Sequence, residues 1–466
     1  MRVTQPYDGE LIAEIPAHTA AEVEKKFEDA VRIFSNRANW LPSYQRIEIL
    51  RRLARLVDRD RDHLALLIAR EGGKPLTDAK VEVTRAISGI ECAASHVQHL
   101  AGTEIPMGLT PASANRWAFT TKEPIGPVVA ISAFNHPLNL IVHQVVPAVS
   151  TGCPVLIKPA PVTPLTCIHL VNLLHEAGLP DPWCQVVILD DNALAQRLAT
   201  DRRVAFFTFI GSAKVGWYLR SQLPAGTRFT LEHGGAAPVI VDKSVDLETV
   251  IEPLVKGGYY HAGQVCVSVQ RIFVHNDLKI EFIQRLSARV DRLSLGDPSS
   301  LDTEVGPLIA PREVKRVAQW VGDGVAEGAT LTVGGSTVGE RLYQPTVLVE
   351  PNPGSLVSTN EIFGPVTCIY GFSELPEAIR RANSLPFAFQ ASIFSRDIDA
   401  ALHAAKHLAA SAVMVNDHSA FRTDWMPFAG LRQSGFGTGG IPHTMNDMVQ
   451  EKMIVLRHQN ASSSYH

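Results

Sequence analysis

Short apolar runs alternate with helical stretches over most of the chain, and this alternation constrains the fold more than any other feature. A first series of apolar runs lies at residues 128–134, 155–157, 186–189, 204–209 and 239–241. A second series includes residues 267–274 and 413–415. Strands that alternate with helices predict an α/β fold, in which helices cover a parallel sheet. Such sheets bind ligands at the carboxyl ends of their strands, so we expect the functional residues there.

Two helical stretches come before this alternation. Thr19 and Glu22 have the spacing of a capping box, and apolar residues follow them at helical spacing. A second helical stretch runs through residues 47–67 and is expected to end at Gly72-Gly73.

Two further segments look like strands but stand outside the main alternation. Residues 105–122 are expected to form an extended hairpin that interrupts the first series, and residues 453–456 a strand near the C-terminus. Both segments are either pairing edges for an oligomer or simple edge strands.

Composition narrows the class of protein. The 466 residues suggest about three structural units. A hydrophobic content of 45% excludes a mostly disordered chain, and a net charge of -4 gives no reason to expect a nucleic-acid partner. No apolar run is long enough to span a membrane, and the start of the chain lacks a secretory signal. Six scattered cysteines without a CxxC pair predict neither disulfides nor a metal site, and favour a cytoplasmic protein.

Three residues are candidates for chemistry, and each also has an ordinary structural explanation. Cys266 is expected on a loop between a helix and a strand, but a free cysteine is more often a small buried hydrophobe than a nucleophile. Glu232 follows a strand and precedes two glycines, which suits a general base or a solvated turn. Asn135 also follows a strand, where it is either an oxyanion donor or a turn former.

A second group of residues suits a bound cofactor. Lys158 ends a strand, from which a lysine can reach a ribose or a phosphate. Gly211 and Ser212 lie between a strand and a helix, and a helix N-terminus of this kind suits a phosphate. Glu361 and Phe363 lie two residues apart before a Gly-Pro turn signal, which by itself indicates little.

Taken together, these motifs resemble the aldehyde dehydrogenase superfamily. The resemblance extends from Tyr7 to residues 427–440, and the motifs agree with the family in order and spacing as well as in content. It implies an oxidoreductase with a Rossmann-like cofactor domain, an α/β catalytic domain and a β oligomerisation arm. The implied boundaries are residues 1–105 and 125–234 for the cofactor domain, 235–437 for the catalytic domain, and 106–124 with 438–466 for the arm. A homodimer or homotetramer follows from the same resemblance.

The resemblance assigns the catalytic roles. Cys266 matches the family's nucleophile, whose thiolate attacks the aldehyde to form a thiohemiacetal. Asn135 matches the donor to the oxyanion, together with the backbone N–H of Cys266. Hydride transfer to the nicotinamide then leaves a thioester, and Glu232 matches the base that activates water to hydrolyse it.

The resemblance also assigns the cofactor contacts. Lys158 matches the contact to the adenosine ribose, Ser212 with Gly211 the contact to the pyrophosphate, and Glu361 with Phe363 the contacts to the nicotinamide ribose and ring. Three positions depart from the family's usual residues: His233 replaces Leu, Phe134 replaces Trp, and Pro161 replaces the Glu that NAD-preferring members often carry. Without this carboxylate there is no repulsion against a 2′-phosphate, so the cofactor choice is open between NAD, the favoured cofactor, and NADP.

The substrate pocket is expected to be polar. Family positions that line the aldehyde tunnel correspond here to Arg85, His136, Leu140, His143, Val265, Val267, Arg422 and Phe428. Two arginines favour a short polar or anionic aldehyde. The alternative is that Arg85 and Arg422 only pair with acids such as Glu82 and Asp424. The segments around residues 415–428 resemble a branch that oxidises lactaldehyde and phosphonoacetaldehyde, although Val265 stands where phosphonate-specific members add an arginine.

Two other functions compete with this one. A CoA-acylating semialdehyde dehydrogenase would release the thioester to CoA, and such enzymes generally lack the base that Glu232 matches. A non-catalytic protein on the same scaffold would have no reason to keep Cys266, Asn135 and Glu232 together.

Overall fold

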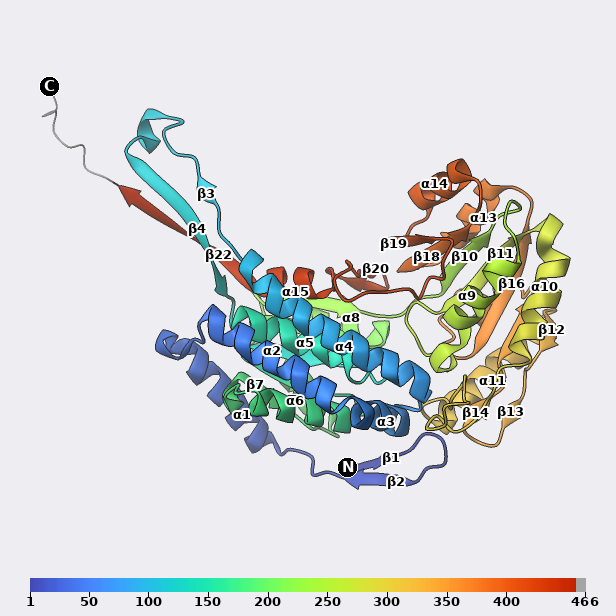
Figure 1. Ribbon diagram of the computed structural model, residues 1–466, viewed down its shortest axis with the longest axis horizontal. Helices are drawn as coiled ribbons and strands as arrows, with labels where there is room; N and C mark the ends of the chain where they lie inside the picture. Colours follow the sequence, from blue (N-terminus) through green and yellow to red (C-terminus); the bar gives the residue numbers. More distant parts are fainter. Residues whose placement is uncertain (458–466) are drawn as a thin grey trace, which may run out of the picture.

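The computed structural model describes residues 1–457 and consists of two lobes and a projecting arm (Figure 1). The first lobe is built around a six-stranded sheet, the second around a seven-stranded sheet, and the arm is a three-stranded sheet. Both large sheets are mainly parallel, as the alternation of strands and helices predicts. The α/β fold class is confirmed.

The first sheet has the strand order β21-β9-β8-β5-β6-β7. Its strands are β5 (Val128–Ile131), β6 (Val155–Lys158), β7 (Cys184–Val186), β8 (Phe206–Ile210), β9 (Arg228–Glu232) and β21 (Gly435–Phe436). All neighbours are parallel except β21, which pairs with β9 in the antiparallel sense. The strand predicted at 186–189 was placed too late: Ile188 has left the sheet, and its N–H donates to Nδ1 of His18 at 2.9 Å.

Helices cover both faces of this sheet. One face packs against α2 (Ser43–Arg59), α3 (Arg61–Gly72), α4 (Leu76–His96), α5 (Asn139–Thr151), α6 (Leu165–Glu176) and α15 (Ile441–Asp447). The other face packs against α1 (Ala20–Ser35), α7 (Asn192–Ala199) and α8 (Ala213–Ser221). Successive strand residues therefore alternate between two hydrophobic cores: Val128 points into the first and Val129 into the second.

The helix boundaries follow local signals. Thr19 and Glu22 form the predicted capping box at the start of α1. The stretch predicted as one helix over residues 47–67 is two helices, because the chain breaks at Asp60 between α2 and α3. The expected end at Gly72-Gly73 is confirmed: Gly73 adopts a left-handed conformation with φ of 71° and caps α3.

The second sheet has the order β12-β15-β16-β11-β10-β18-β19, in which only β12 is antiparallel to its neighbour. Its strands are β10 (Ala237–Val241), β11 (Val269–His275), β12 (Thr330–Val333), β15 (Thr346–Val349), β16 (Val366–Phe372), β18 (Gln390–Phe394) and β19 (Ala412–Val415). Its helices are α9 (Glu248–Tyr259), α10 (Asn276–Val290), α11 (Pro311–Ala326), α12 (Leu356–Thr359), α13 (Leu375–Ala382) and α14 (Ile398–His407). Short pairs complete the chain: β1 (Arg2–Thr4) with β2 (Leu11–Glu14), β13 (Thr337–Val338) with β14 (Leu342–Tyr343), and β17 (Phe387–Ala388) with β20 (Leu431–Arg432).

The two strand-like segments outside the alternation meet in the arm. The central strand β4 (Arg116–Pro124) pairs with β22 (Val449–Arg457) on one side and β3 (Glu104–Ile105) on the other, all antiparallel. Of the segment 438–466 expected in the arm, only β22 lies there, because α15 is buried in the first lobe; residues 458–466 lie outside the described part. The domain boundaries stay a prediction.

Residues 1–457 contain no membrane-spanning helix, metal cluster or disulfide. No helix there is long and apolar enough to cross a membrane. No group of His, Cys, Asp and Glu side chains there is arranged to hold a metal ion. All six cysteines are free, and four of them are fully buried in the two lobes.

Candidate active site

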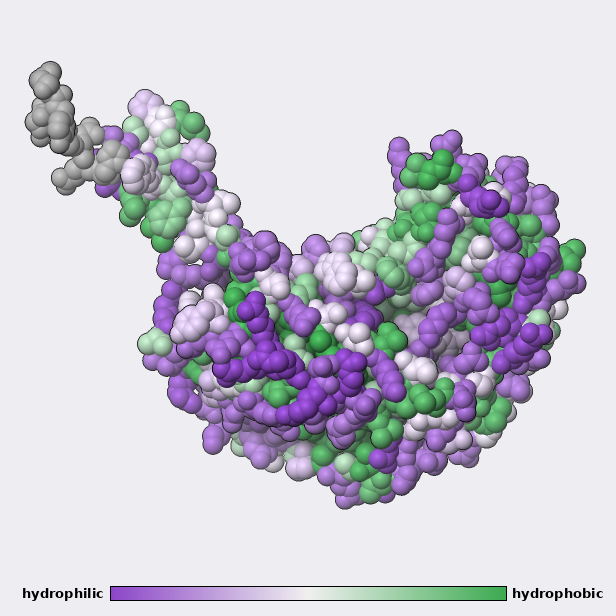
Figure 2. Space-filling model, in the orientation of Figure 1, coloured by the Kyte–Doolittle hydropathy of each residue, from purple (hydrophilic) through white to green (hydrophobic). Residues whose placement is uncertain are grey.

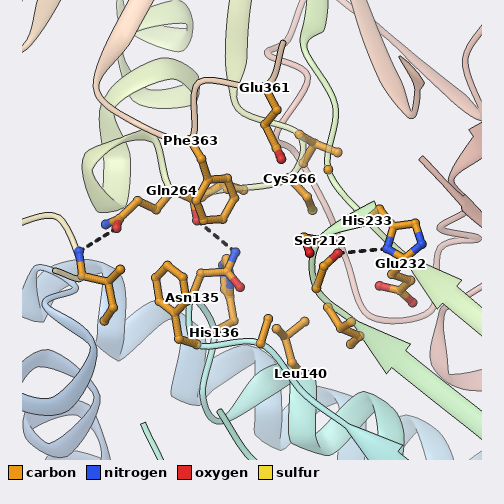
Figure 3. Close-up of a pocket in the computed structure, with 18 of the residues that line it drawn as sticks. Asn135, His136, Leu140, Ser212, Glu232, His233, Gln264, Cys266, Glu361 and Phe363 are labelled. Atoms are coloured by element: carbon orange, nitrogen blue, oxygen red, sulfur yellow. Dashed lines mark hydrogen bonds between the residues drawn. The ribbon is translucent and has the colours of Figure 1, made fainter. Parts of the chain in front are cut away.

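A cavity of about 480 Å³ lies between the two lobes. The first lobe contributes the residues that follow β5, β8 and β9, which are carboxyl ends of parallel strands. The second lobe contributes the loop before β11 and the segment around Glu361. Seven of the predicted catalytic and cofactor residues line this one cavity: Asn135, Gly211, Ser212, Glu232, Cys266, Glu361 and Phe363. All of them except Gly211 are labelled in Figure 3.

Cys266 lies on the loop between a 3-10 turn at Tyr260–Gly263 and β11. This turn has an unusual backbone: His261 and Ala262 have φ of 50° and 53°, and Gly263 has φ of 68°. A Cβ atom on Gly263 would lie 2.2 Å from the carbonyl oxygen of Gly364, so only glycine fits. The turn brings the thiol loop close against the segment that carries Glu361 and Phe363.

The side chain of Gln264 fixes this loop. Its Nε2 donates to the carbonyl oxygens of His261 and Pro307 at 3.2 and 3.3 Å, and its Oε1 accepts from the N–H of Ile309 at 2.9 Å. The backbone carbonyl of Gln264 accepts a hydrogen bond of 2.9 Å from Nδ2 of Asn135 (Figure 3). A primary amide has two N–H groups, so Asn135 keeps one for a second acceptor. The sequence argument missed Gln264, because only its contacts reveal its part in the site.

Burial controls the protonation of the reactive groups. It raises the pKa of the Cys266 thiol to about 12, with a further rise from the charge of Glu232, while Arg422 acts in the opposite direction. Burial also raises the pKa of Glu232. It raises the pKa of Glu361 to about 8, although the Gly235 N–H, 3.2 Å away, favours the charged form. A carboxylate with a raised pKa is a better proton acceptor near neutral pH, as a general base requires.

Two glycines leave space for the carboxylates. A Cβ atom on Gly234 would lie 1.7 Å from the carboxylate of Glu361. A Cβ atom on Gly439 would lie 2.3 Å from that of Glu232. Glu232 is the last residue of β9, so its backbone is fixed by the sheet while its side chain faces the cavity.

The beginning of α8 is open toward the cavity. Ser212 is the N-cap residue, but its hydroxyl makes no capping hydrogen bond. The preceding carbonyl, that of Gly211, is bonded to Nδ1 of His233 at 2.9 Å. The ring of His233 lies edge-on to Phe209 and Trp217, and in this way it occupies the position where the family usually has Leu.

The remaining predicted cofactor residues differ in position. Phe363 lines the cavity with φ of 49°, and its ring lies edge-on to Phe134 at 5.9 Å between centroids. Lys158 ends β6 as predicted, but it does not line the cavity. Among residues 1–457, the one group within hydrogen-bond reach of its ammonium is the carbonyl of Pro159, at 3.5 Å, and burial lowers the pKa of Lys158.

The arrangement of thiol, amide and carboxylate around one cavity agrees with comparisons to known proteins. The sequence model described as "Aldehyde dehydrogenase family" matches residues 1–454. The chain belongs to the aldehyde dehydrogenase family. The family-level resemblance and the fold are therefore confirmed.

Several characterised proteins are similar to this aldehyde dehydrogenase. The 3-sulfolactaldehyde dehydrogenase of Priestia aryabhattai is 36% identical over 98% of this chain and 94% of its own. Aldehyde dehydrogenase 21 of Physcomitrella patens, solved in complex with the reaction product succinate, superposes with a TM-score of 0.95 at 33% identity, covering 99% and 95% of the two chains. The glyceraldehyde-3-phosphate dehydrogenase GapN of Methanocaldococcus jannaschii, solved with NADP, has a TM-score of 0.93 at 33% identity, covering 98% and 99%.

The predicted substrate residues of this aldehyde dehydrogenase fall into two groups. Arg85, His136, Arg422 and Phe428 line the cavity, whereas His143 lies behind its wall and is 5% exposed. Both arginines carry a buried Nε without a hydrogen-bond partner in the described residues. Beyond the predicted set, the cavity is also lined by Tyr260, Arg312, Arg316 and Trp320, which no sequence pattern singled out.

The two arginines have different partners. Arg85 forms the ion pair that the structural alternative anticipated, at 2.9 Å to Asp424. Arg422 has no carboxylate within ion-pair distance among residues 1–457. Its guanidinium lies 3.5 Å from the centre of the Phe428 ring, and its Nη2 lies 3.3 Å from Nδ1 of His143.

Proposed function

We propose that this aldehyde dehydrogenase oxidises a short aldehyde bearing an anionic group to the carboxylic acid, with NAD(P)⁺ as the oxidant. One observation carries the substrate class: Arg422 lines the same cavity as Cys266 and lacks a carboxylate partner among the described residues. A guanidinium withdrawn from water is best satisfied by an anion, and its planar fork suits a carboxylate or a sulfonate.

The residues of the cavity support the chemistry of each step. The Cys266 thiolate attacks the aldehyde carbon, and the free N–H of Asn135 with the backbone N–H of Cys266 donates to the oxygen that gains charge. Bound nicotinamide cofactor supplies the hydride acceptor for the oxidation to a thioester. Glu232 then takes a proton from the water that attacks the thioester, for which its raised pKa is suited. The acid leaves, and Cys266 is regenerated.

The cavity fits a dinucleotide. Ser212 at the start of α8 makes no side-chain capping hydrogen bond within residues 1–457, and the first backbone N–H groups of such a helix suit a pyrophosphate. Glu361 and Phe363 line the same cavity, which supports a contact of Glu361 with a ribose hydroxyl and of Phe363 with the nicotinamide ring. No carboxylate among residues 1–457 contacts Lys158, and Pro161 adds none. This pair of residues is compatible with a phosphate on the adenosine ribose as well as with a hydroxyl. Both NAD and NADP therefore belong to the proposal.

The relatives support a polar substrate. They are named for 3-sulfolactaldehyde and glyceraldehyde 3-phosphate, and one is bound to succinate. The test is cofactor reduction by the purified protein with succinic semialdehyde, 3-sulfolactaldehyde, lactaldehyde and hexanal. We expect kcat/KM to be highest for an anionic aldehyde. A preference for hexanal would show that Arg422 does not anchor the substrate.

The competing functions have their own tests. Glu232 faces the cavity, which disfavours a CoA-acylating enzyme; formation of acyl-CoA when free CoA is added would support it instead. A protein that binds cofactor but oxidises none of the four aldehydes would support the non-catalytic alternative.

The arm supports assembly into a homodimer or homotetramer. Pairing of β4 with β22 aligns Phe119 with Ile454 and Trp117 with Leu456, so that apolar side chains share one face. Phe119 and Leu456 are 38% and 52% exposed, and Figure 2 shows apolar residues gathered on the projecting arm. Such a face fits a second copy of the chain. Sedimentation of the protein at micromolar concentration should give a mass of two or four chains, and a monomer would contradict this.

A cytoplasmic location, which the free cysteines favour, completes the proposal.

A further inference from the structure

Asp424 is the centre of a buried network behind the substrate wall. Its Oδ1 accepts three hydrogen bonds, each of 2.9 Å, from Nη2 of Arg85, Nδ2 of Asn139 and Nε2 of His143. The residue is 1% exposed. Burial would raise the pKa of this carboxyl, but His143, Arg85 and Asn139 hold it well below its usual range. Asp424 is therefore ionised at every pH at which the protein is assayed.

The same network fixes the state of His143. Arginine can only donate hydrogen bonds, so the Nδ1 of His143 that faces Arg422 must be an acceptor. The proton of the neutral imidazole then lies on Nε2 and is donated to Asp424. Burial and the charge of Arg422 lower the pKa of His143 to about 4, in agreement with a neutral ring. His143 thus connects Asp424 to Arg422 without adding charge.

This network leaves Arg422 as its one guanidinium without an ion-pair partner among residues 1–457. Arg312 and Arg316, which also line the cavity, lie outside the network and share Glu313. Asp424 contacts Arg85 directly but reaches Arg422 only through neutral His143. The opposite charges of the nearby buried ion pair between Lys74 and Glu82 cancel each other. The charges of Glu232, of Asp424 and of the Cys266 thiolate also act on Arg422, and they can only reduce its positive charge further.

We propose that Asp424 is a specificity-determining residue that compensates Arg85 and thereby limits the anion site to monoanionic aldehydes, such as those bearing a carboxylate or sulfonate. A dianionic phosphate would bring a second negative charge to a wall with one free guanidinium. Charge that is uncompensated in a partly buried site is strongly disfavoured. This inference rests on the proposed function and narrows its substrate class.

The chain offers a nearly isosteric test of the charge. In Asp424→Asn, the side-chain oxygen can still accept from Arg85, Asn139 and His143, because all three bonds end on the one oxygen. The variant frees the charge of Arg85 while keeping the contacts. In Asn139→Ala, by contrast, one of the three bonds is lost but the charge of Asp424 stays, so this variant is the matched control.

The selectivity is measured as kcat/KM for glyceraldehyde 3-phosphate divided by kcat/KM for succinic semialdehyde. We expect Asp424→Asn to raise this ratio about tenfold or more, since a unit charge within a few ångströms has at least that effect in a partly buried site. Asn139→Ala should leave the ratio within about twofold of the wild type. An unchanged ratio in Asp424→Asn, or an equal rise in Asn139→Ala, would overturn the role of the charge.

The wild-type enzyme gives a second test that does not depend on a variant folding. A phosphate monoester loses its second proton near pH 6, so its monoanionic fraction rises from about 3% at pH 7.5 to about 76% at pH 5.5. The carboxylate of succinic semialdehyde stays ionised over this range. Ionisation of Cys266 and Glu232 changes kcat/KM for both aldehydes alike, so its effect cancels in the ratio. We expect the ratio to rise by up to roughly 25-fold on acidification. A flat or falling ratio would contradict the proposal.

Different results would contradict the proposed function and the role of Asp424. If the wild type does not prefer succinic semialdehyde to uncharged lactaldehyde, the proposed function fails. If that preference holds but the phosphate ratio responds neither to pH nor to Asp424→Asn, only the role of Asp424 fails.

Discussion

Replacement of Arg422 by Gln tests the anion anchor directly. Within the described part of the chain, the polar and ring contacts of Arg422 are to His143, at 3.3 Å, and to the face of Phe428, at 3.5 Å, and its side chain also lines the cavity. A hydrogen bond to a charged group contributes about 1.5–3 kcal/mol. Its loss should therefore reduce kcat/KM for an anionic aldehyde by about 10-fold to 150-fold.

The cost to stability should be much smaller. The contact of a guanidinium with an aromatic face contributes about 0.5–2 kcal/mol, and the substitution also removes a buried Nε that has no partner. Arg422→Gln should therefore fold normally, with the free energy of unfolding lower by about 1 kcal/mol. Chemical denaturation followed by fluorescence checks this before the kinetics are interpreted.

The assay compares two aldehydes of similar size, anionic succinic semialdehyde and uncharged lactaldehyde. Arg422→Gln should lose activity with the first and keep it within about threefold with the second. Arg422→Lys should have an intermediate kcat/KM for succinic semialdehyde, because lysine keeps the positive charge but lacks the two parallel N–H donors of the guanidinium. An equal loss with both aldehydes would refute the reasoning, since it would place Arg422 among the residues that support the site in general.

Four further outcomes follow from the same structure. Cys266→Ala should abolish aldehyde oxidation while fluorescence titration still shows cofactor binding. In the cofactor-free wild type, alkylation of Cys266 by iodoacetamide should accelerate about tenfold per pH unit between pH 7 and 9, because its thiol pKa is about 12 and only the thiolate reacts. Glu82→Gln should lower the free energy of unfolding by about 3–5 kcal/mol, since it leaves Lys74 buried without its counter-ion. Glu123→Gln, which removes the partner of the exposed Arg37, should lower it by about 1 kcal/mol or less. Pro161→Glu should weaken NADP relative to NAD about tenfold in calorimetric titration, by repulsion of the 2′-phosphate.

The layered fold could be predicted from the sequence, but its strand order could not. The alternation of apolar runs with helices indicates parallel sheets, because strand and helix periodicities are local properties. The pairing of β5 with both β6 and β8 joins distant segments, and no local pattern encodes it. The break between α2 and α3 at Asp60 also escaped prediction, since the apolar spacing continues across it.

The catalytic residues could be named from motifs, whereas the residues that hold them could not. Cys266, Asn135 and Glu232 were each expected near the end of a strand or on a loop, and they line one cavity. Asp424 was considered only as an ion partner for arginine. Its contacts with Asn139 and His143 depend on how α5 packs against the loop before α15, which spacing in the sequence does not reveal.

The central claim is that Cys266 carries an acyl group which Glu232 helps to hydrolyse. Its most direct test is the mass of the Glu232→Gln variant after mixing with cofactor and succinic semialdehyde. We predict one reduced cofactor per active site in a rapid burst, and a mass increase equal to the acyl group on the peptide that contains Cys266. Steady turnover at the wild-type rate without an adduct would contradict the account.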